Sequence, residues 1–190
     1  KARMKESLAF TKQKFEKEGI LIEEDTINAI TQIEPTTIHK LLGYKPNSIY
    51  FKQDASNQIE ADVIIIDECS MIDIGLFSKL LAAINPTTTK LILLGDRHQL
   101  ASVDAGSLFG DLCLSIPTLN RFSPPTFDYL NKFCSQQGNP LPIEYCQKQD
   151  VPLFDHIVEL QVSHRFSDDK GIGKFSKAVL LGDIETIETE

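Results

Sequence analysis

The sequence predicts an α/β fold with a parallel sheet, and two apolar segments carry this prediction. Residues 63–66 read Val-Ile-Ile-Ile and residues 91–94 read Leu-Ile-Leu-Leu, without the polar alternation of a half-exposed strand. Such runs are expected of strands that are covered on both faces. A helix is predicted over residues 75–84 and is ended by Asn85-Pro86. Strand, helix and strand in this order form a βαβ unit with a right-handed crossover.

Composition agrees with a globular protein. A chain of 190 residues, 42% of them hydrophobic, can bury a core. The four cysteines have neither zinc-site nor disulfide-framework spacing, so reduced thiols and a cytoplasmic location are expected. The net charge of −8 argues against a protein that coats nucleic acid through bulk electrostatics. The chain starts at Lys1 and not at Met, so we expect it to be a piece of a longer one.

Helices and a hairpin are predicted before the first strand. The helices are expected over residues 1–18, 24–33 and 38–42. Thr36-Thr37 can cap the third helix and Gly43 can end it. Residues 44–60 combine a β-prone segment with a polar turn, which predicts a small hairpin.

The second half of the chain is predicted to be less regular. Six of the nine prolines fall within residues 117–152, so we expect an irregular insert over residues 117–155. A strand over residues 157–162 and a helix over residues 173–181 should follow. The predicted division is therefore residues 1–116, the insert, and residues 156–190.

Two carboxylates, Asp67 and Glu68, directly follow the first predicted strand. Strands of a parallel sheet deliver their C-terminal residues to the crevice in which ligands bind, and adjacent carboxylates are costly there unless they meet a cation or accept a proton. In a phosphate-hydrolysing site the first carboxylate helps to hold Mg²⁺, and the second orients or deprotonates the attacking water. The alternative is that both residues cap the following helix.

Two further polar segments follow predicted strands. Gln99 comes after Gly95-Asp96, and an amide at a neighbouring strand tip can sense a γ-phosphate or a hydrolytic water. The alternative there is a plain turn. Arg165 has a planar guanidinium that suits a developing phosphoryl charge. Its alternative is a surface ion pair with Asp168 or Asp169.

The first third of the chain is neutral enough to meet a phosphate backbone, because residues 1–60 carry nine basic and nine acidic side chains. Considered alone, Lys1 and Arg3 would be solvated charges. Likewise, His39 would be a histidine satisfied within its helix.

Four motifs in this order resemble the RecD family, the alpha subunit of exodeoxyribonuclease V, a superfamily 1 DNA helicase. They read TIHKLLG at 37–43, VIIIDECSMID at 63–73, LGDRHQLASVDAG at 94–106 and HRF at 164–166. The resemblance runs from residue 1 to about residue 183 and is weakest across the insert. It implies a partial RecA-like sheet of the P-loop NTPase type, with a second RecA-like domain beginning near residue 156.

The resemblance implies roles for single residues. Asp67 would serve Mg²⁺, Glu68 would activate water, Gln99 would link the nucleotide state to the DNA site, and Arg165 would reach the γ-phosphate. Single-stranded DNA would be contacted by Lys1, Arg3, Thr37 and His39. Residues 44–57 stand where the family carries its small strand-separating hairpin.

The resemblance also implies an activity for the whole protein. That activity is ATP-dependent 5′-to-3′ translocation on single-stranded DNA, beside the beta and gamma subunits of the nuclease. The family usually has Tyr where this chain has His164, and no Gly-x-x-x-x-Gly-Lys-[Ser/Thr] phosphate loop occurs in residues 1–190. We therefore expect the chain alone to bind ATP and DNA poorly. Two alternatives remain from the residues themselves: a carboxylate-metal nuclease using Asp67, Glu68 and Asp96, and a non-catalytic module that docks on a partner.

Overall fold

A computed structural model describes residues 13, 23–99, 108–134, 140–162 and 171–189. The chain separates into two compact units, Lys1–Leu108 and Phe109–Glu190, which are treated separately below. Within the described residues, no helix is long and apolar enough to cross a membrane. The predicted helix over residues 1–18 lies outside the described residues except at Gln13, which is helical.

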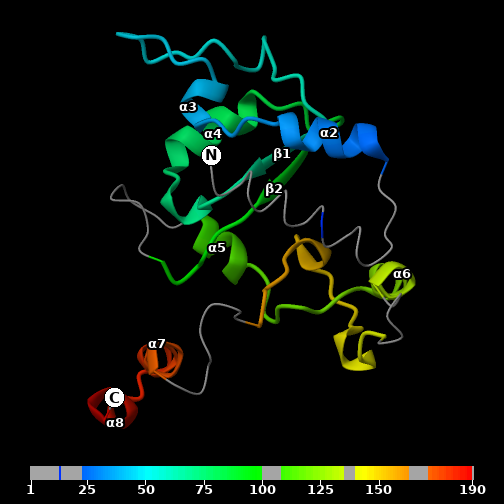
Figure 1. The fold of residues 1–190 in the computed structure, drawn as a ribbon, viewed down its shortest axis with the longest axis vertical. Helices are drawn as coiled ribbons and strands as arrows, with labels where there is room; N and C mark the ends of the chain where they lie inside the picture. Colours follow the sequence, from blue (N-terminus) through cyan, green and yellow to red (C-terminus); the bar gives the residue numbers. More distant parts are fainter. Residues whose placement is uncertain (1–12, 14–22, 100–107, 135–139, 163–170, 190) are drawn as a thin grey trace. The chain divides into compact units, whose positions relative to one another are not determined.

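The first unit is organised by a parallel pair of strands, β1 (Val63–Ile66) and β2 (Lys90–Leu93), as predicted (Figure 1). The register pairs Val63 with Lys90 and Ile66 with Leu93. The helix between the strands, α4, spans Ile74–Ala82. It starts one residue earlier than the predicted helix starts and ends two residues earlier than the predicted helix ends. The βαβ unit is therefore confirmed.

One expectation about the strands is wrong, because the pair is covered on one face only. Ile64 and Ile66 are buried, whereas Val63 is 47% exposed and Ile65 is 62% exposed. Side chains alternate between the two faces of a strand, so these exposed residues share one face. The described residues bury the other face and leave this one open to solvent.

The core of the first unit lies under α4. Leu80 is fully buried, and Phe77, Ala83 and Ile84 are buried beside it in the sequence. The segment leading into β1 is tied to the end of this helix, because Ile59 N donates to Ala83 O at 2.7 Å. Helix α4 thus supplies both the apolar core and a backbone anchor for the approach to β1.

Asp73 caps helix α4, since its Oδ1 accepts a hydrogen bond from Leu76 N at 2.8 Å. We expect Asp73→Ala to lower the free energy of unfolding by about 0.5–2 kcal/mol, because the first turn of the helix loses the acceptor for a free N–H. Asp73→Asn keeps an acceptor oxygen and should cost only a few tenths of that. Urea unfolding followed by circular dichroism measures both; equal losses in the two variants would contradict the capping role.

Two short helices precede the strands. Helix α2 spans Glu24–Gln32 and α3 spans Ile38–Leu41, close to the predicted bounds. Thr37 caps α3 as expected, accepting from Lys40 N at 3.3 Å. Gly43 ends the helix with φ +70°, and an added Cβ would lie 2.7 Å from Lys52 Cβ. Both the left-handed backbone and the close approach therefore require glycine at this position.

The predicted hairpin over residues 44–60 is present only in reduced form. The chain reverses through two isolated antiparallel bridges, Tyr44 with Phe51 and Asp54 with Asn57, and no regular strand forms. The Asp54 carboxylate accepts from Ser56 N and Asn57 N and so holds the second reversal. Local side-chain bonds of this kind compete with a strand ladder.

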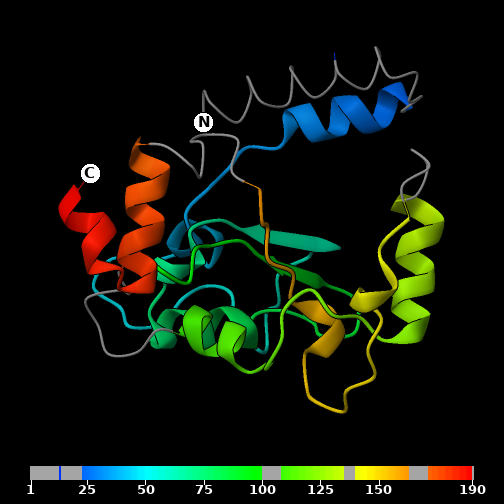
Figure 2. The ribbon, with the colours of Figure 1, turned by 90° about the horizontal axis from the view of Figure 1, so that it is seen from below.

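The second unit contains more helix than predicted. Its elements are α5 (Leu108–Leu114, beginning at the junction of the units), α6 (Pro124–Cys134), the 3₁₀ turns η3 (Ile143–Tyr145) and η4 (Phe154–His156), α7 (Gly171–Leu181) and α8 (Ile184–Thr189). Helices α7 and α8 contact each other (Figure 2). The predicted helix over residues 173–181 is confirmed, whereas an entirely irregular insert is wrong because α6 lies within it.

The strand predicted over residues 157–162 does not form. The backbone of Glu159 instead meets the side chain of Asn120: Asn120 Nδ2 donates to Glu159 O at 2.9 Å and Glu159 N donates to Asn120 Oδ1 at 2.8 Å. One side-chain amide thus satisfies a donor and an acceptor that a neighbouring strand would otherwise use.

Asp155 anchors the start of α6 and should make the second unit sensitive to acid. Its two carboxylate oxygens accept from Ser123 N at 2.7 Å and from Ser123 Oγ at 2.6 Å. Burial raises the pKa of Asp155, whereas the two bonds from Ser123, together with Thr126 and the charge of His156, lower it. The net effect is a pKa below its ordinary value.

A lowered folded-state pKa stabilises the fold above the unfolded-state pKa, and the stabilisation is lost as the pH falls through the folded-state value. The stability difference between the wild type and Asp155→Asn should therefore shrink as the pH falls below about 4. Urea unfolding at several pH values measures it, with the exposed Asp150→Asn as control. A difference that does not change with pH would refute the assignment.

Candidate strand-tip site

The ends of β1 and β2 bring the predicted site segments together at one edge of the sheet. Cys69 N, just beyond β1, donates to Leu94 O, just beyond β2, at 2.9 Å. Ser70 Oγ donates to Gln99 Oε1 at 3.2 Å. The Asp67-Glu68 segment and the Gln99 segment are therefore joined by one backbone bond and one side-chain bond, as expected for the C-terminal edge of a parallel pair.

Glu68 has an unusual backbone. Its φ of 56° and ψ of 43° lie in the left-handed region, which a residue with a side chain adopts at a cost. Asp67 Oδ1 accepts from Glu68 N at 2.9 Å and supports this turn. Both carboxylates are exposed. Backbone strain of this kind is concentrated at functional sites, because surrounding structure must stabilise it.

The capping alternative for the two carboxylates does not describe this turn. Helix α4 is capped by Asp73, and the Glu68 side chain makes no capping bond to η1 (Cys69–Met71), which it precedes. Glu68 therefore has a left-handed backbone and an exposed side chain, and among the described residues its carboxylate does not serve as a helix cap.

Cys69 lies buried behind the carboxylates. Its Sγ is 3.4 Å from Ile66 O. Burial raises the pKa of the Cys69 thiol, and the nearby Asp67 carboxylate raises it further. A thiol with a raised pKa stays protonated near neutral pH and is a poor nucleophile and metal ligand. Cys69 is thus a packing residue of the turn.

The plain-turn alternative holds for Asp96 but does not account for Gln99. Asp96 Oδ1 accepts from His98 N at 2.9 Å, and Asp96 O accepts from Gln99 N at 3.2 Å. Through these two bonds, Asp96 stabilises the turn on which Gln99 lies. Gln99 in turn contacts Ser70, a buried residue of the first strand tip.

The carboxylates suit a hard cation such as Mg²⁺, which prefers oxygen ligands and usually takes only one or two of them from carboxylates. Among residues 23–99 and the other described ranges, no three His, Cys, Asp or Glu side chains are grouped to hold a metal. Asp67 and Glu68 could therefore supply only part of the oxygen ligands that such a cation takes.

The predicted DNA-facing residues are only partly described. Thr37 caps α3 through its side chain. The exposed His39 ring packs on Tyr44, with centroids 6.4 Å apart, and on Phe51 at 5.9 Å. These contacts agree with the reading of His39 as a histidine satisfied locally, and its contact with DNA stays a prediction. Lys1, Arg3 and Arg165 lie outside the described residues.

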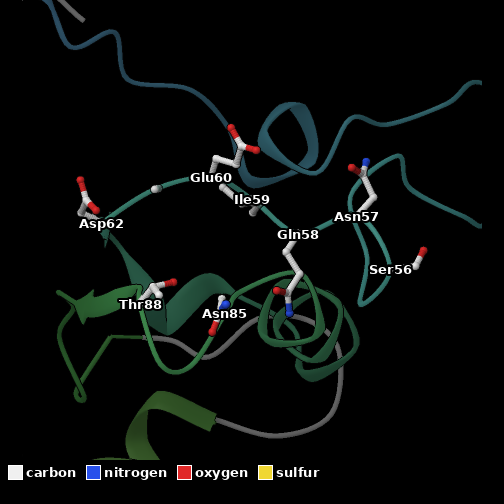
Figure 3. A pocket seen from close by; sticks show the side chains of 9 residues that line it. Ser56, Asn57, Gln58, Ile59, Glu60, Asp62, Asn85 and Thr88 are labelled. Carbon is white, nitrogen blue, oxygen red and sulfur yellow. The ribbon is translucent and has the colours of Figure 1, made fainter.

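A groove of about 600 Å³ lies at the opposite edge of the sheet, where the strands begin (Figure 3). Glu60 and Asp62, on the segment that leads into β1, lie across it from Asn85 and Thr88. Ligands of parallel sheets bind at the carboxyl ends of the strands. The groove is therefore separate from the site defined by Asp67, Glu68 and Gln99.

Comparison with known proteins defines the class to which this sheet and site belong. Residues 4–105 match the family model described as an AAA domain. The chain belongs to that family, and an AAA domain implies a P-loop NTPase fold. The parallel β1–β2 pair with its carboxylates at the C-terminal edge agrees with this class.

Individual relatives narrow the assignment. The chain is 34% identical over 168 residues to RecBCD enzyme subunit RecD of Haemophilus influenzae, covering 88% of this chain and 25% of that protein. It is 44% identical over 155 residues to RecBCD enzyme subunit RecD of Mycobacterium tuberculosis, covering 82% and 20%. It is 36% identical over 93 residues to the ATP-dependent RecD2 DNA helicase of Deinococcus radiodurans, covering 49% and 13%.

The chain belongs to the RecD family, which confirms the resemblance seen in the four sequence motifs. It spans a quarter or less of the length of these three relatives.

Proposed function

We propose that this chain forms the metal and water part of an ATP-hydrolysis site in a RecD-type DNA helicase. The observation that carries the proposal is the joined pair of strand tips: strained Glu68 beside Asp67 on one tip, and Gln99, held by Ser70, on the other. Family membership supports the same reading.

The residues at this edge have separable tasks. Asp67 would hold Mg²⁺, which supplies positive charge that stabilises the transferring phosphoryl group. Glu68, with an exposed carboxylate and no capping bond, would orient the attacking water and accept its proton. Gln99 would contact the γ-phosphate or the water through its amide. Arg165 would approach the γ-phosphate from the second RecA-like domain.

Residues 1–190 contain no Gly-x-x-x-x-Gly-Lys-[Ser/Thr] sequence, whose backbone N–H groups and lysine would cradle the phosphates. Hydrolysis therefore requires a polypeptide that carries this chain together with such a loop. The chain alone should bind ATP and DNA poorly.

In the complete polypeptide, hydrolysis would drive 5′-to-3′ movement along single-stranded DNA. The DNA contacts would be Lys1, Arg3, Thr37 and His39, and the partners would be the beta and gamma subunits of an exodeoxyribonuclease V complex. The relatives named as RecBCD subunits support this assignment. The test is ATP turnover by the complete polypeptide with and without single-stranded DNA. Turnover that is absent, or that does not respond to DNA, would overturn the helicase assignment.

A further inference from the structure

Ser70 is a buried polar residue to which the hydrolysis mechanism above gives no task. It is 4% exposed and lies on η1, two residues beyond Glu68. Its Oγ donates to Gln99 Oε1 at 3.2 Å. A hydroxyl buried without a partner costs free energy, so this bond matters to the turn as well as to Gln99.

The backbone on both sides of this bond is fixed. Cys69 N is bonded to Leu94 O on the side of Ser70. On the side of Gln99, the turn is closed by the bonds of Asp96 to His98 N and Gln99 N. With both backbones held, the Ser70 hydroxyl is placed to orient the Gln99 side-chain amide through this bond.

A glutamine amide carries an acceptor oxygen and a donor nitrogen, and the two ends do opposite things in a phosphate site. Phosphate oxygens accept hydrogen bonds, so a contact with them requires the nitrogen end. Because Ser70 donates to Oε1, the two N–H groups of Nε2 are left to donate elsewhere.

We propose that Ser70 is a positioning residue that holds Gln99 with its donor nitrogen available to the transferring phosphoryl group. This inference rests on the proposed function and deepens it: the role of Ser70 would be exerted through Gln99 and not through the nucleotide or the metal. The loss of one neutral hydrogen bond should therefore reduce turnover modestly and only while Gln99 is present.

A double-mutant cycle in the complete polypeptide tests this. Ser70→Ala should lower kcat for ATP about 3- to 10-fold with little change in KM. In a Gln99→Ala background the same change should have no further effect, and Ser70→Thr, which keeps the hydroxyl, should restore most of the activity. An unchanged kcat, or an equal fold-loss with and without Gln99, would overturn the proposal.

A second measurement needs no turnover. In ¹⁵N-labelled chain 1–190, the side-chain N–H₂ signals of Gln99, assigned by their loss in Gln99→Glu, should shift on Ser70→Ala and not on the exposed control Ser56→Ala. No shift would count against the proposal. If Ser70→Ala has no effect while Glu68→Gln abolishes turnover, only this inference fails; if Glu68→Gln has no effect, the hydrolysis site and this inference both fail.

Discussion

Replacing Glu68 with glutamine should reduce ATP turnover by about 10²- to 10⁴-fold in a polypeptide that carries this chain and a phosphate-binding loop. Glutamine has the same size and can still orient a water, but it cannot take the proton of that water near neutral pH. Glu68 makes no capping bond, so the fold should tolerate the change. Steady-state hydrolysis in the presence of single-stranded DNA measures the loss, and binding of ATP should persist because the phosphate-binding loop and Asp67 are both unchanged.

Glu60→Gln is the matched control for this experiment. It makes the same chemical change on an exposed glutamate that lies before β1, at the edge of the sheet away from the strand tips. Its turnover should equal that of the wild type. Wild-type turnover by Glu68→Gln would remove Glu68 from the mechanism, and an equal loss in both variants would point to a general effect of charge.

The sheet could be predicted because its signals are local. Residues 63–66 and 91–94 are short apolar runs rich in β-branched or leucine side chains, and a helical segment with its own cap separates them. Those patterns specify strand, helix and strand without reference to distant residues. The open face at Val63 and Ile65 could not be predicted, because an apolar run does not reveal whether the chain at hand supplies a cover for both faces.

The errors in the second unit have identifiable causes. The six prolines within residues 117–152 predict irregular chain, yet two of them, Pro124 and Pro125, are the first residues of α6. Proline is tolerated there because the first N–H groups of a helix have no partner within the helix. The run from Ile157 to Val162 has strand-forming residues, but the Asn120 amide, 39 positions away from Glu159 in the sequence, occupies that backbone. Tertiary partners of this kind override local propensity.

In the candidate site, too, some residues could be predicted from the sequence and others could not. Asp67, Glu68 and Gln99 could be named from the sequence because each follows an apolar strand. Ser70 could not be singled out, because its partner Gln99 is 29 positions away and the bond depends on how the two tips meet. The sequence signal for Ser70 is weak, since it is only a hydroxyl side chain two residues after Glu68.

Truncation of the fully buried Leu80 should be costly; Leu80 and Leu42 are the large side chains of the first unit that have no exposed surface among the described residues. We expect Leu80→Ala to lower the free energy of unfolding by about 2–5 kcal/mol, because it removes buried apolar atoms and leaves a cavity beneath α4. Chemical denaturation measures the total loss, and hydrogen exchange of the α4 amides assigns it to this unit.

Leu81→Ala is the matched control on the next residue of the same helix. Leu81 is 48% exposed, so the same truncation loses less buried area and opens no enclosed cavity. Its cost should stay below about 1 kcal/mol. Equal losses at the two positions would mean that α4 contributes to stability through helix propensity and not through its buried face. The βαβ unit that positions Asp67 and Glu68 would then need another source of stability.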